Sequence, residues 1–262
     1  MTALPPISSD PTIQIRGLVV GFGARTVLNG LSLEVRRGEV LGVVGASGGG
    51  KSVLMRTIIG LVPRRAGSIT VLGTALDTAT PEQWHAIERR WGVLFQHGAL
   101  FSSLTVIQNI EFPMREYLPI SKPMRREIAM AKLEMVGLRA SDADKLPSEL
   151  SGGMIKRAAL ARALALDPPI VFLDEPTSGL DPISAAEFDA LIRTLQQTLG
   201  LTVFMVTHDL ASLRTVCDRI AVLADGQVVA LGPMETMLQS DHPWVKNYFQ
   251  GVRAMMLEPV AQ

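Results

Sequence analysis

An eight-residue loop rich in glycine constrains this chain of 262 residues more than any other feature. Residues 45–52 read GASGGGKS and match the pattern G-x-x-x-x-G-K-[ST], directly after a strand-like run and directly before a helical one. The glycines let backbone N–H groups converge on phosphate oxygens, and the helix N-terminus adds a dipole that favours negative charge. We therefore expect Lys51 to reach the β- and γ-phosphates of a nucleotide and Ser52 to coordinate Mg²⁺.

Two carboxylates follow another apolar strand, because residues 170–175 read IVFLDE and end in Asp174 and Glu175. In a parallel sheet, ligands lie beyond the carboxyl ends of the strands, so both acids are expected to project towards the phosphate loop. Asp174 suits a partner of Mg²⁺, and Glu175 suits a base that orients and deprotonates an attacking water. Without the phosphate loop, such a pair would more often be solvated acids at the start of a loop.

Two further polar residues end apolar strands. His208 follows LTVFMVT, and Gln96 follows VLF. We expect His208 to contact a γ-phosphate and the Gln96 amide to hold water or metal while the adjoining segment moves. The alternative for each is an ordinary polar residue at a strand end.

Strand-like and helical patterns alternate along the chain, which predicts an α/β fold on a mainly parallel sheet with helices on both faces. Residues 98–149 differ, since they lack strand-like runs and carry helical patterns, notably at 122–138. We interpret them as a helical insertion. Asp225 and Gly226, between two apolar strands, predict a hairpin turn.

Composition counts against several other classes of protein. The formal net charge is zero, so no basic field favours nucleic acid or an anionic membrane surface. The single cysteine, Cys217, allows neither a disulfide framework nor a cysteine-based zinc site, and we expect it to be a buried small residue. No apolar run approaches the ~18–20 residues of a membrane span, so a membrane role has to come through a partner.

With these motifs in this order, residues 13–240 resemble the nucleotide-binding subunit of an ATP-binding-cassette (ABC) transporter. The family's motifs are an aromatic residue that stacks on adenine, the Walker A loop, the Q-loop, the signature, the Walker B strand with its glutamate, the D-loop and the switch histidine. In this sequence they are Phe22, residues 45–52, Gln96, residues 150–154, residues 170–175, residues 178–181 and His208. The resemblance implies an ATPase that uses ATP and Mg²⁺.

The resemblance also implies a role for each site residue. Those that bind the nucleotide are Phe22, Gly45, Ala46, Ser47, Gly48, Gly49, Gly50, Lys51, Ser52, Val53, Ser151, Gly152, Gly153 and Asp181. Those that hold the metal are Ser52, Gln96 and Asp174, and those that act in hydrolysis are Glu175, His208, Gln96 and Lys51. Val53 departs from the family, in which a second hydroxyl is common at this position, and leaves Ser52 as the sole hydroxyl ligand.

The fold implied is a P-loop NTPase core of the ABC type with an antiparallel β subdomain and a helical subdomain. We expect a flexible leader at 1–12, an ATPase domain at 13–240 and a C-terminal extension at 241–262. Within the ATPase domain, residues 13–96 and 151–240 form the core with its β subdomain, and residues 97–150 form the helical subdomain.

The signature reads LSGGM at 150–154 and opens a helix on two glycines, which are poor helix formers. In ABC ATPases two subunits pair head to tail around two ATP molecules, and each signature caps the γ-phosphate held by the other chain. Ser151 can donate its hydroxyl, and the glycines let the backbone come close. A simple N-cap at Ser151 is the alternative, but it does not explain the glycines. Met154 replaces the usual glutamine and can offer only a weak acceptor.

LSGGM together with FQHGALF at 95–101 resembles the ATPases of Mla-type transporters, which work with MCE-domain proteins and move phospholipid between bacterial membranes. The expected function is therefore energising phospholipid transport that maintains outer-membrane lipid asymmetry. An ABC transporter for an amino acid, a metal or a lipoprotein is one alternative. A soluble ABC ATPase acting on DNA or ribosomes is another, although such proteins usually carry two cassettes, a coiled-coil insertion or zinc cysteines.

The resemblance implies partners as well. We expect a homodimer, a membrane permease that contacts the helical subdomain, and an MCE-domain periplasmic protein, with or without a small accessory subunit. No nucleic acid is expected. The chain is expected to lie at the cytoplasmic face of the bacterial inner membrane, bound through the permease. Leu100, Phe101 and Leu104 either line the permease groove or form the core of the insertion. The apolar stripe of the tail either packs on its own domain or docks on another subunit, and consists of Trp244, Tyr248, Val252, Met255 and Met256.

Overall fold

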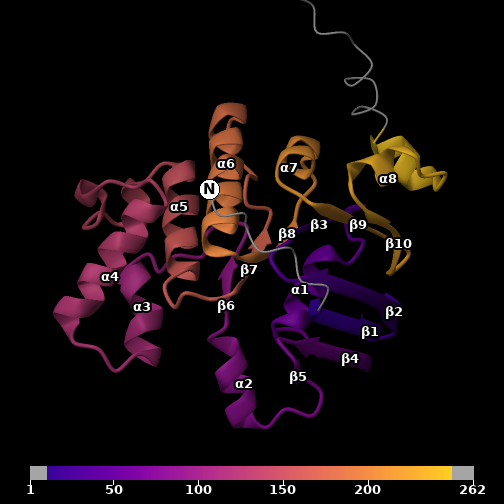
Figure 1. The fold of residues 1–262 in the computed structure, drawn as a ribbon, viewed down its shortest axis with the longest axis horizontal. Coiled ribbons are helices and arrows are strands. Elements are labelled where there is room, and N and C mark those ends of the chain that lie inside the picture. Colours follow the sequence, from indigo (N-terminus) through magenta and orange to yellow (C-terminus); the bar gives the residue numbers. More distant parts are fainter. Residues whose placement is uncertain (1–10, 250–262) are drawn as a thin grey trace, which may run out of the picture. The chain divides into compact units, whose positions relative to one another are not determined.

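The computed structural model describes residues 11–249. They divide into two compact units, which we call unit I (residues 79–205) and unit II (residues 11–78 and 206–249). The helices and strands of both are labelled in Figure 1. None of the helices in residues 11–249 combines the length and the apolar character that a membrane crossing requires.

Unit II contains the antiparallel β subdomain that we expected. Its sheet has the order β2-β1-β4-β5 and consists of β1 (Pro11–Phe22), β2 (Arg25–Arg36), β4 (Ala66–Val71) and β5 (Thr74–Ala75). The predicted leader ends too late, since residues 11 and 12 belong to β1, where backbone pairing with β2 extends the strand. The rest of the leader, residues 1–10, lies outside the described residues.

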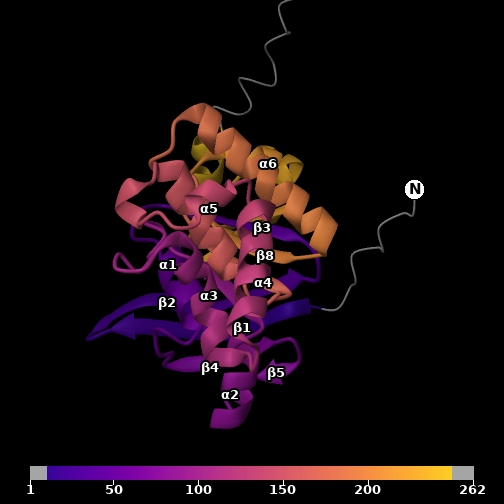
Figure 2. The same cartoon turned by 90° about the vertical axis from the view of Figure 1, so that its left-hand side faces the viewer.

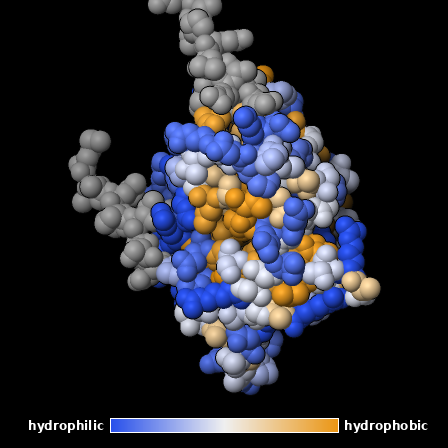
Figure 3. Space-filling view, turned by 90° about the vertical axis from the view of Figure 1, so that its right-hand side faces the viewer, coloured by the Kyte–Doolittle hydropathy of each residue, from blue (hydrophilic) through white to orange (hydrophobic). Residues whose placement is uncertain are grey.

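A second group of strands in unit II carries the phosphate loop. The strands β3 (Val40–Gly45) and β9 (Arg219–Ala224) pair in parallel, and β9 pairs antiparallel with β10 (Gln227–Gly232) through the predicted turn at Asp225 and Gly226. Figure 3 looks from the side on which Figure 1 draws β10 and β2, and it shows hydrophobic residues gathered near the middle of that face. Along β10, Val228 and Val229 are half-buried and Leu231 is exposed.

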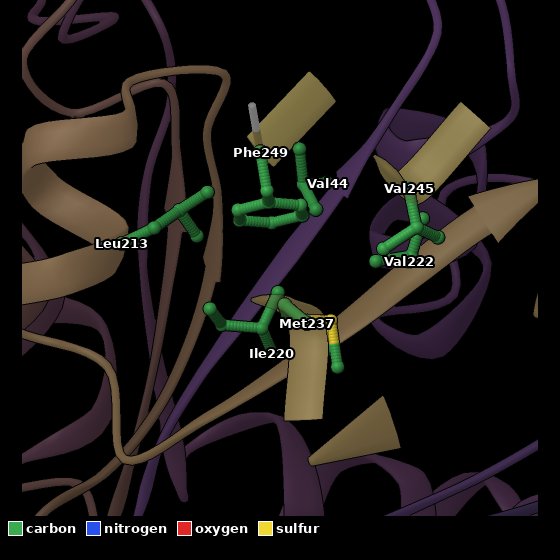
Figure 4. Close-up of a cluster of buried hydrophobic side chains, with 7 residues drawn as sticks. All are labelled: Val44, Leu213, Ile220, Val222, Met237, Val245 and Phe249. Carbon is green, nitrogen blue, oxygen red and sulfur yellow. The ribbon is translucent and has the colours of Figure 1, made fainter. Parts of the chain in front are cut away.

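The helices of unit II are α1 (Lys51–Ile58), α7 (Leu210–Thr215), α8 (Met234–Leu238) and a helical segment at residues 243–249. Figure 4 shows the buried cluster that joins three of them to the strands, and it consists of Val44, Leu213, Ile220, Val222, Met237, Val245 and Phe249. Residues 243–249 therefore pack on their own unit. The rest of the predicted stripe, Val252, Met255 and Met256, lies outside the described residues. Cys217 is half-buried and packs against the cluster.

Unit I contains three strands and most of the helices. Its strands are β6 (Trp91–Leu94), β7 (Ile170–Asp174) and β8 (Thr202–Val206), and β7 lies between β8 and β6. The pairing of β6 with β7 is parallel. Its helices are α2 (Pro81–Glu88), α3 (Val106–Tyr117), α4 (Lys122–Met135), α5 (Gly152–Ala163) and α6 (Pro182–Leu199), with short 3₁₀ turns at Ala140–Asp142 and Pro147–Glu149.

The expected helical insertion is formed by α3 and α4, which pack against each other and against α5 (Figures 1 and 2). Thr105 begins α3 with a capping box, because its hydroxyl accepts from the Gln108 N–H while the Gln108 side chain accepts from the Thr105 N–H. Ser121 caps α4 in a similar way. These capping hydrogen bonds fix the residues at which α3 and α4 begin.

Candidate nucleotide site

The phosphate loop leaves β3 at Gly45 and enters α1 at Lys51. Gly50 has a φ of 96°, and a Cβ at this residue would lie 2.7 Å from Cδ2 of Leu28. Both the backbone conformation and the packing therefore require glycine. The Lys51 ammonium donates to the carbonyls of Gly45 at 2.8 Å and Ala46 at 3.1 Å. The lysine is thus held over its own loop, beside the N–H groups that open α1 and can bind an anion.

A cavity of about 560 Å³ adjoins the loop within unit II. Its walls are the loop itself at 46–49, the start of β2 at 25–29, the β9–β10 turn, and His242 and Trp244. Sequence reasoning did not connect His242 and Trp244 with the phosphate loop. The only signal was the apolar stripe of the tail, which says nothing about which element the stripe covers.

Two other predicted residues of unit II are accessible. Phe22 ends β1 with 53% of its surface exposed, so its ring is free of the core and available for stacking, although it does not line the cavity. His208 follows β8, is exposed, and accepts a hydrogen bond on its carbonyl from the Tyr248 hydroxyl at 2.6 Å. The helical segment at 243–249 therefore helps to place the backbone of His208.

The two predicted acids end β7 in unit I. Asp174 is its last residue and is only 2% exposed, whereas Glu175 is half-buried. Glu175 has a φ of 50°, in the left-handed region that residues with a side chain rarely adopt. Such a conformation is strained by about 1–3 kcal/mol and persists only where the surroundings hold it.

Lys156 of α5 is the group that holds Glu175. It is 4% exposed, and its ammonium donates to the Glu175 carbonyl at 2.9 Å and to the Gln96 carbonyl. Burial lowers the pKa of Lys156, and the nearby carboxylates of Glu175 and Asp174 oppose this shift. Sequence reasoning did not assign Lys156 a role, because lysines on helices usually face solvent. A signal was present, since an alanine-rich helix without a polar face is a buried helix, and a buried lysine needs partners.

Other basic side chains of α5 also bind backbone carbonyls. Arg162 donates to Ala99 at 2.6 Å and to Gly98 at 2.8 Å, and burial lowers its pKa. Arg157 donates to the carbonyl of Val136 at 2.8 Å. The segment that follows β6 and contains Gln96 is therefore attached to α5. The Gln96 side chain itself is exposed.

The signature opens α5 as predicted, with Ser151 as the N-cap whose hydroxyl accepts from the Met154 N–H at 3.3 Å. Packing within residues 11–249 does not explain the two glycines that follow. A Cβ at Gly153 would meet no atom within 4 Å, and a Cβ at Gly152 would meet only Cδ2 of Leu180 at 3.7 Å, an ordinary contact. Neither has a positive φ. Ser151 and Gly152 are exposed, and Met154 is half-buried.

Asp181 acts as the N-cap of α6. Its carboxylate accepts from the N–H groups of Ile183 at 3.1 Å and Ser184 at 3.0 Å and from the Ser184 hydroxyl at 2.6 Å. These hydrogen bonds lower the pKa of Asp181. Its visible role is therefore to fix the start of α6, a role that sequence reasoning did not consider beside nucleotide contact.

The residues predicted to hold a metal offer oxygen ligands, which Mg²⁺ prefers. Ser52 in unit II offers a hydroxyl, and Asp174 and Gln96 in unit I offer a carboxylate and an amide. Throughout residues 11–249, three or more His, Cys, Asp or Glu side chains nowhere gather as a metal cluster.

The predicted site residues thus fall into two sets. Unit II contains the phosphate loop with Val53, Phe22 and His208, and unit I contains Gln96, Asp174, Glu175, the signature and Asp181. Each unit therefore carries part of the predicted site.

Comparison with known proteins identifies related chains. A family model described as ABC transporter matches residues 28–178. A probable ribonucleotide transport ATP-binding protein, mkl, of Mycobacterium leprae is 41% identical over 241 residues, which are 92% of this chain and 69% of the relative. The intermembrane phospholipid transport system ATP-binding protein MlaF of Haemophilus influenzae is 38% identical over 239 residues, which are 91% of this chain and 90% of the relative.

Among solved structures, a dimeric structure of the ATP-binding cassette MJ0796, bound to ADP and Pi in a post-hydrolysis state, matches with a TM-score of 0.78. It is 30% identical and covers 85% of this chain and 98% of the other. This likeness confirms the predicted α/β fold with its antiparallel sheet and helical regions.

Proposed function

Because the chain belongs to the ABC transporter family, we propose that it is the ATP-hydrolysing subunit of a bacterial phospholipid transporter, bound at the cytoplasmic face of the inner membrane. Lys51 and the loop N–H groups bind the β- and γ-phosphates, and Phe22 stacks on adenine. Ser52, Asp174 and Gln96 hold Mg²⁺, which offsets phosphate charge. Glu175 takes the proton of the attacking water, and His208 contacts the γ-phosphate.

Two copies share two ATP molecules in this proposal, and the observation that carries it is the pair of glycines at 152 and 153. Glycine is a poorer helix former than alanine, by about 0.5–1 kcal/mol in a helix interior, and α5 begins with two of them. Packing within the chain does not require them, since alanine would fit at both positions. A phosphate held by a second copy would explain the glycines, because it can approach the backbone N–H groups at the start of α5 only where no Cβ blocks them.

Gly153→Ala tests whether the signature binds the partner's phosphate or only caps α5. We expect the variant to be at least as stable as wild type, with the free energy of unfolding raised by no more than about 1 kcal/mol, because alanine is the better helix former. ATP hydrolysis is expected to fall about tenfold or more, since the added methyl displaces the partner's phosphate. Urea unfolding and steady-state hydrolysis measure the two effects. Unchanged hydrolysis would leave Ser151 as a simple helix cap.

The permease is proposed to dock in a groove of about 380 Å³ in unit I. The residues that line the groove include Trp91, Phe95, Phe112, Tyr117 and Phe101, of which Phe101 is 44% exposed. Phe101 and Phe112 have ring centroids 4.7 Å apart. Exposed aromatic side chains over a concave site favour a protein partner.

Phe101→Glu is expected to weaken permease binding about 30-fold or more, the effect of losing one central aromatic anchor. ATP affinity should not change, because Phe101 is not among the residues proposed to bind the nucleotide. Copurification of the permease from solubilised membranes measures the loss. Met124→Glu is the matched control, since Met124 is 50% exposed on α4 and does not line the groove. Equal recovery of permease with both variants would refute docking at Phe101.

Phospholipid is the proposed cargo because LSGGM and FQHGALF occur together and because the MlaF relative is matched over 90% of its length. The name of the mkl relative favours a second candidate cargo, a ribonucleotide. The test is to purify the complex from solubilised membranes and reconstitute it in lipid vesicles. Copurification of an MCE-domain protein, with or without a small accessory subunit, and ATP-dependent movement of labelled phospholipid support the proposal. Ribonucleotide movement, or copurified ribosomes or DNA, would contradict it.

A further inference from the structure

Lys156 lies on the helix that carries the signature and contacts the residues expected to hydrolyse ATP. It lies five positions after Ser151, which is a rise of about 7.5 Å along α5. Its ammonium bonds to the carbonyls of both Gln96 and Glu175, which follow the neighbouring strands β6 and β7. Lys156 thus joins three motifs that the sequence scatters over about 80 positions.

Several hydrogen bonds attach α5 to the segments that contain Gln96 and Glu175. Arg162 holds the carbonyls of Gly98 and Ala99, so α5 anchors the segment 96–99 at three carbonyls. On the other side, Glu175 keeps its left-handed φ of 50° with its carbonyl bound to Lys156. A shift of α5 along or about its axis therefore has to move the backbone of Gln96 and Glu175, or break hydrogen bonds to charged groups, which are the stronger kind.

We propose that Lys156 is a positioning residue that links the signature to Gln96 and Glu175 of the same chain, so that binding of the partner's ATP at Ser151 aligns the groups that hydrolyse this chain's own ATP. The inference rests on the proposed function, because it needs an ATP shared with a second copy. It adds a route by which each of the two ATP molecules affects hydrolysis of the other.

The test compares Lys156→Met with Lys156→Arg in the full chain. Methionine has a similar volume but no hydrogen-bond donor, whereas arginine keeps the positive charge and has N–H groups that can donate to both carbonyls. Lys132→Met is the matched control, since Lys132 is also buried, in unit I, but pairs with Asp167 and contacts neither Gln96 nor Glu175. For each variant, ATP affinity, kcat and the Hill coefficient for ATP are measured.

We expect Lys156→Met to lower kcat about 10- to 100-fold, the effect of losing a hydrogen bond to a charged group. Its ATP affinity should stay within about threefold of wild type, because the phosphate loop is untouched. The Hill coefficient should fall to about one, the value for independent sites. Lys156→Arg should recover a large part of kcat, and Lys132→Met should match wild type in all three.

A measurement without nucleotide keeps this inference separate from the proposed function. Hydrogen–deuterium exchange of residues 96–99 and 175–178 should be faster in Lys156→Met than in wild type and unchanged in Lys132→Met. If wild type neither hydrolyses ATP nor dimerises with it, the proposed function fails, whatever the exchange shows. If wild type is active, either of two results overturns the inference. One is that Lys156→Met hydrolyses ATP cooperatively and at a near-wild-type rate. The other is that Lys132→Met loses as much kcat as Lys156→Met does.

Discussion

The Glu175→Gln variant is expected to bind ATP as tightly as wild type and to hydrolyse it about 10²- to 10⁴-fold more slowly. The substitution removes the group that accepts the proton of the attacking water and keeps the size of the side chain. It leaves the backbone bond from Lys156 to the Glu175 carbonyl available, since that bond does not involve the side chain. The variant should therefore fold normally and retain ATP at the site.

Single-turnover hydrolysis and nucleotide binding measure the two halves of this prediction. Glu134→Gln is the matched control, because Glu134 is an exposed acid on α4 of the same unit. It should behave as wild type in both measurements. Hydrolysis by Glu175→Gln at a near wild-type rate would show that another group activates the water.

Lys51→Ala is expected to weaken ATP binding about 10- to 100-fold, because a charge-assisted hydrogen bond to phosphate is lost. In the structure the ammonium is held by the carbonyls of Gly45 and Ala46, so it already lies beside the loop that we propose binds the phosphates. Wild type should gain thermal stability with added ATP, since a ligand that binds only the folded state stabilises it. Lys51→Ala should gain little at the same concentration.

The comparison of melting temperatures with and without ATP also separates binding from folding. Without nucleotide, Lys51→Ala should melt close to wild type, apart from the small loss of its two bonds within the loop. Lys246→Ala removes an exposed lysine of the same unit and should keep the full effect of ATP. An equal stabilisation of Lys51→Ala by ATP would contradict the role of Lys51.

The sequence was sufficient to predict which residues follow the ends of strands, because the apolar run that forms a strand also shows where the strand ends. Asp174 and Glu175 follow directly from the end of β7, and the phosphate loop follows from the end of β3 and the start of α1. The helical insertion was equally visible, since a long stretch without strand-like alternation can hardly join a sheet.

Contacts between distant segments were not predictable in the same way. The local sequence pattern does not indicate that Lys156 donates to the carbonyl of Gln96, 60 positions away. Nor does it indicate that the Tyr248 hydroxyl donates to the carbonyl of His208. Both depend on how helices pack, which a single sequence does not specify. The capping role of Asp181 was missed for a different reason, because the resemblance offered a functional role and the ordinary N-cap was not considered.

The central claim, that two copies complete each other's ATP sites, is tested most directly by the mass of Glu175→Gln in solution. Light scattering should give about 28.3 kDa without nucleotide and about twice that with ATP and Mg²⁺. Adding Gly153→Glu should keep ATP binding and abolish the dimer, because the carboxylate repels the partner's γ-phosphate. A chain that binds ATP yet remains a monomer, or a dimer that Gly153→Glu leaves intact, would contradict the account.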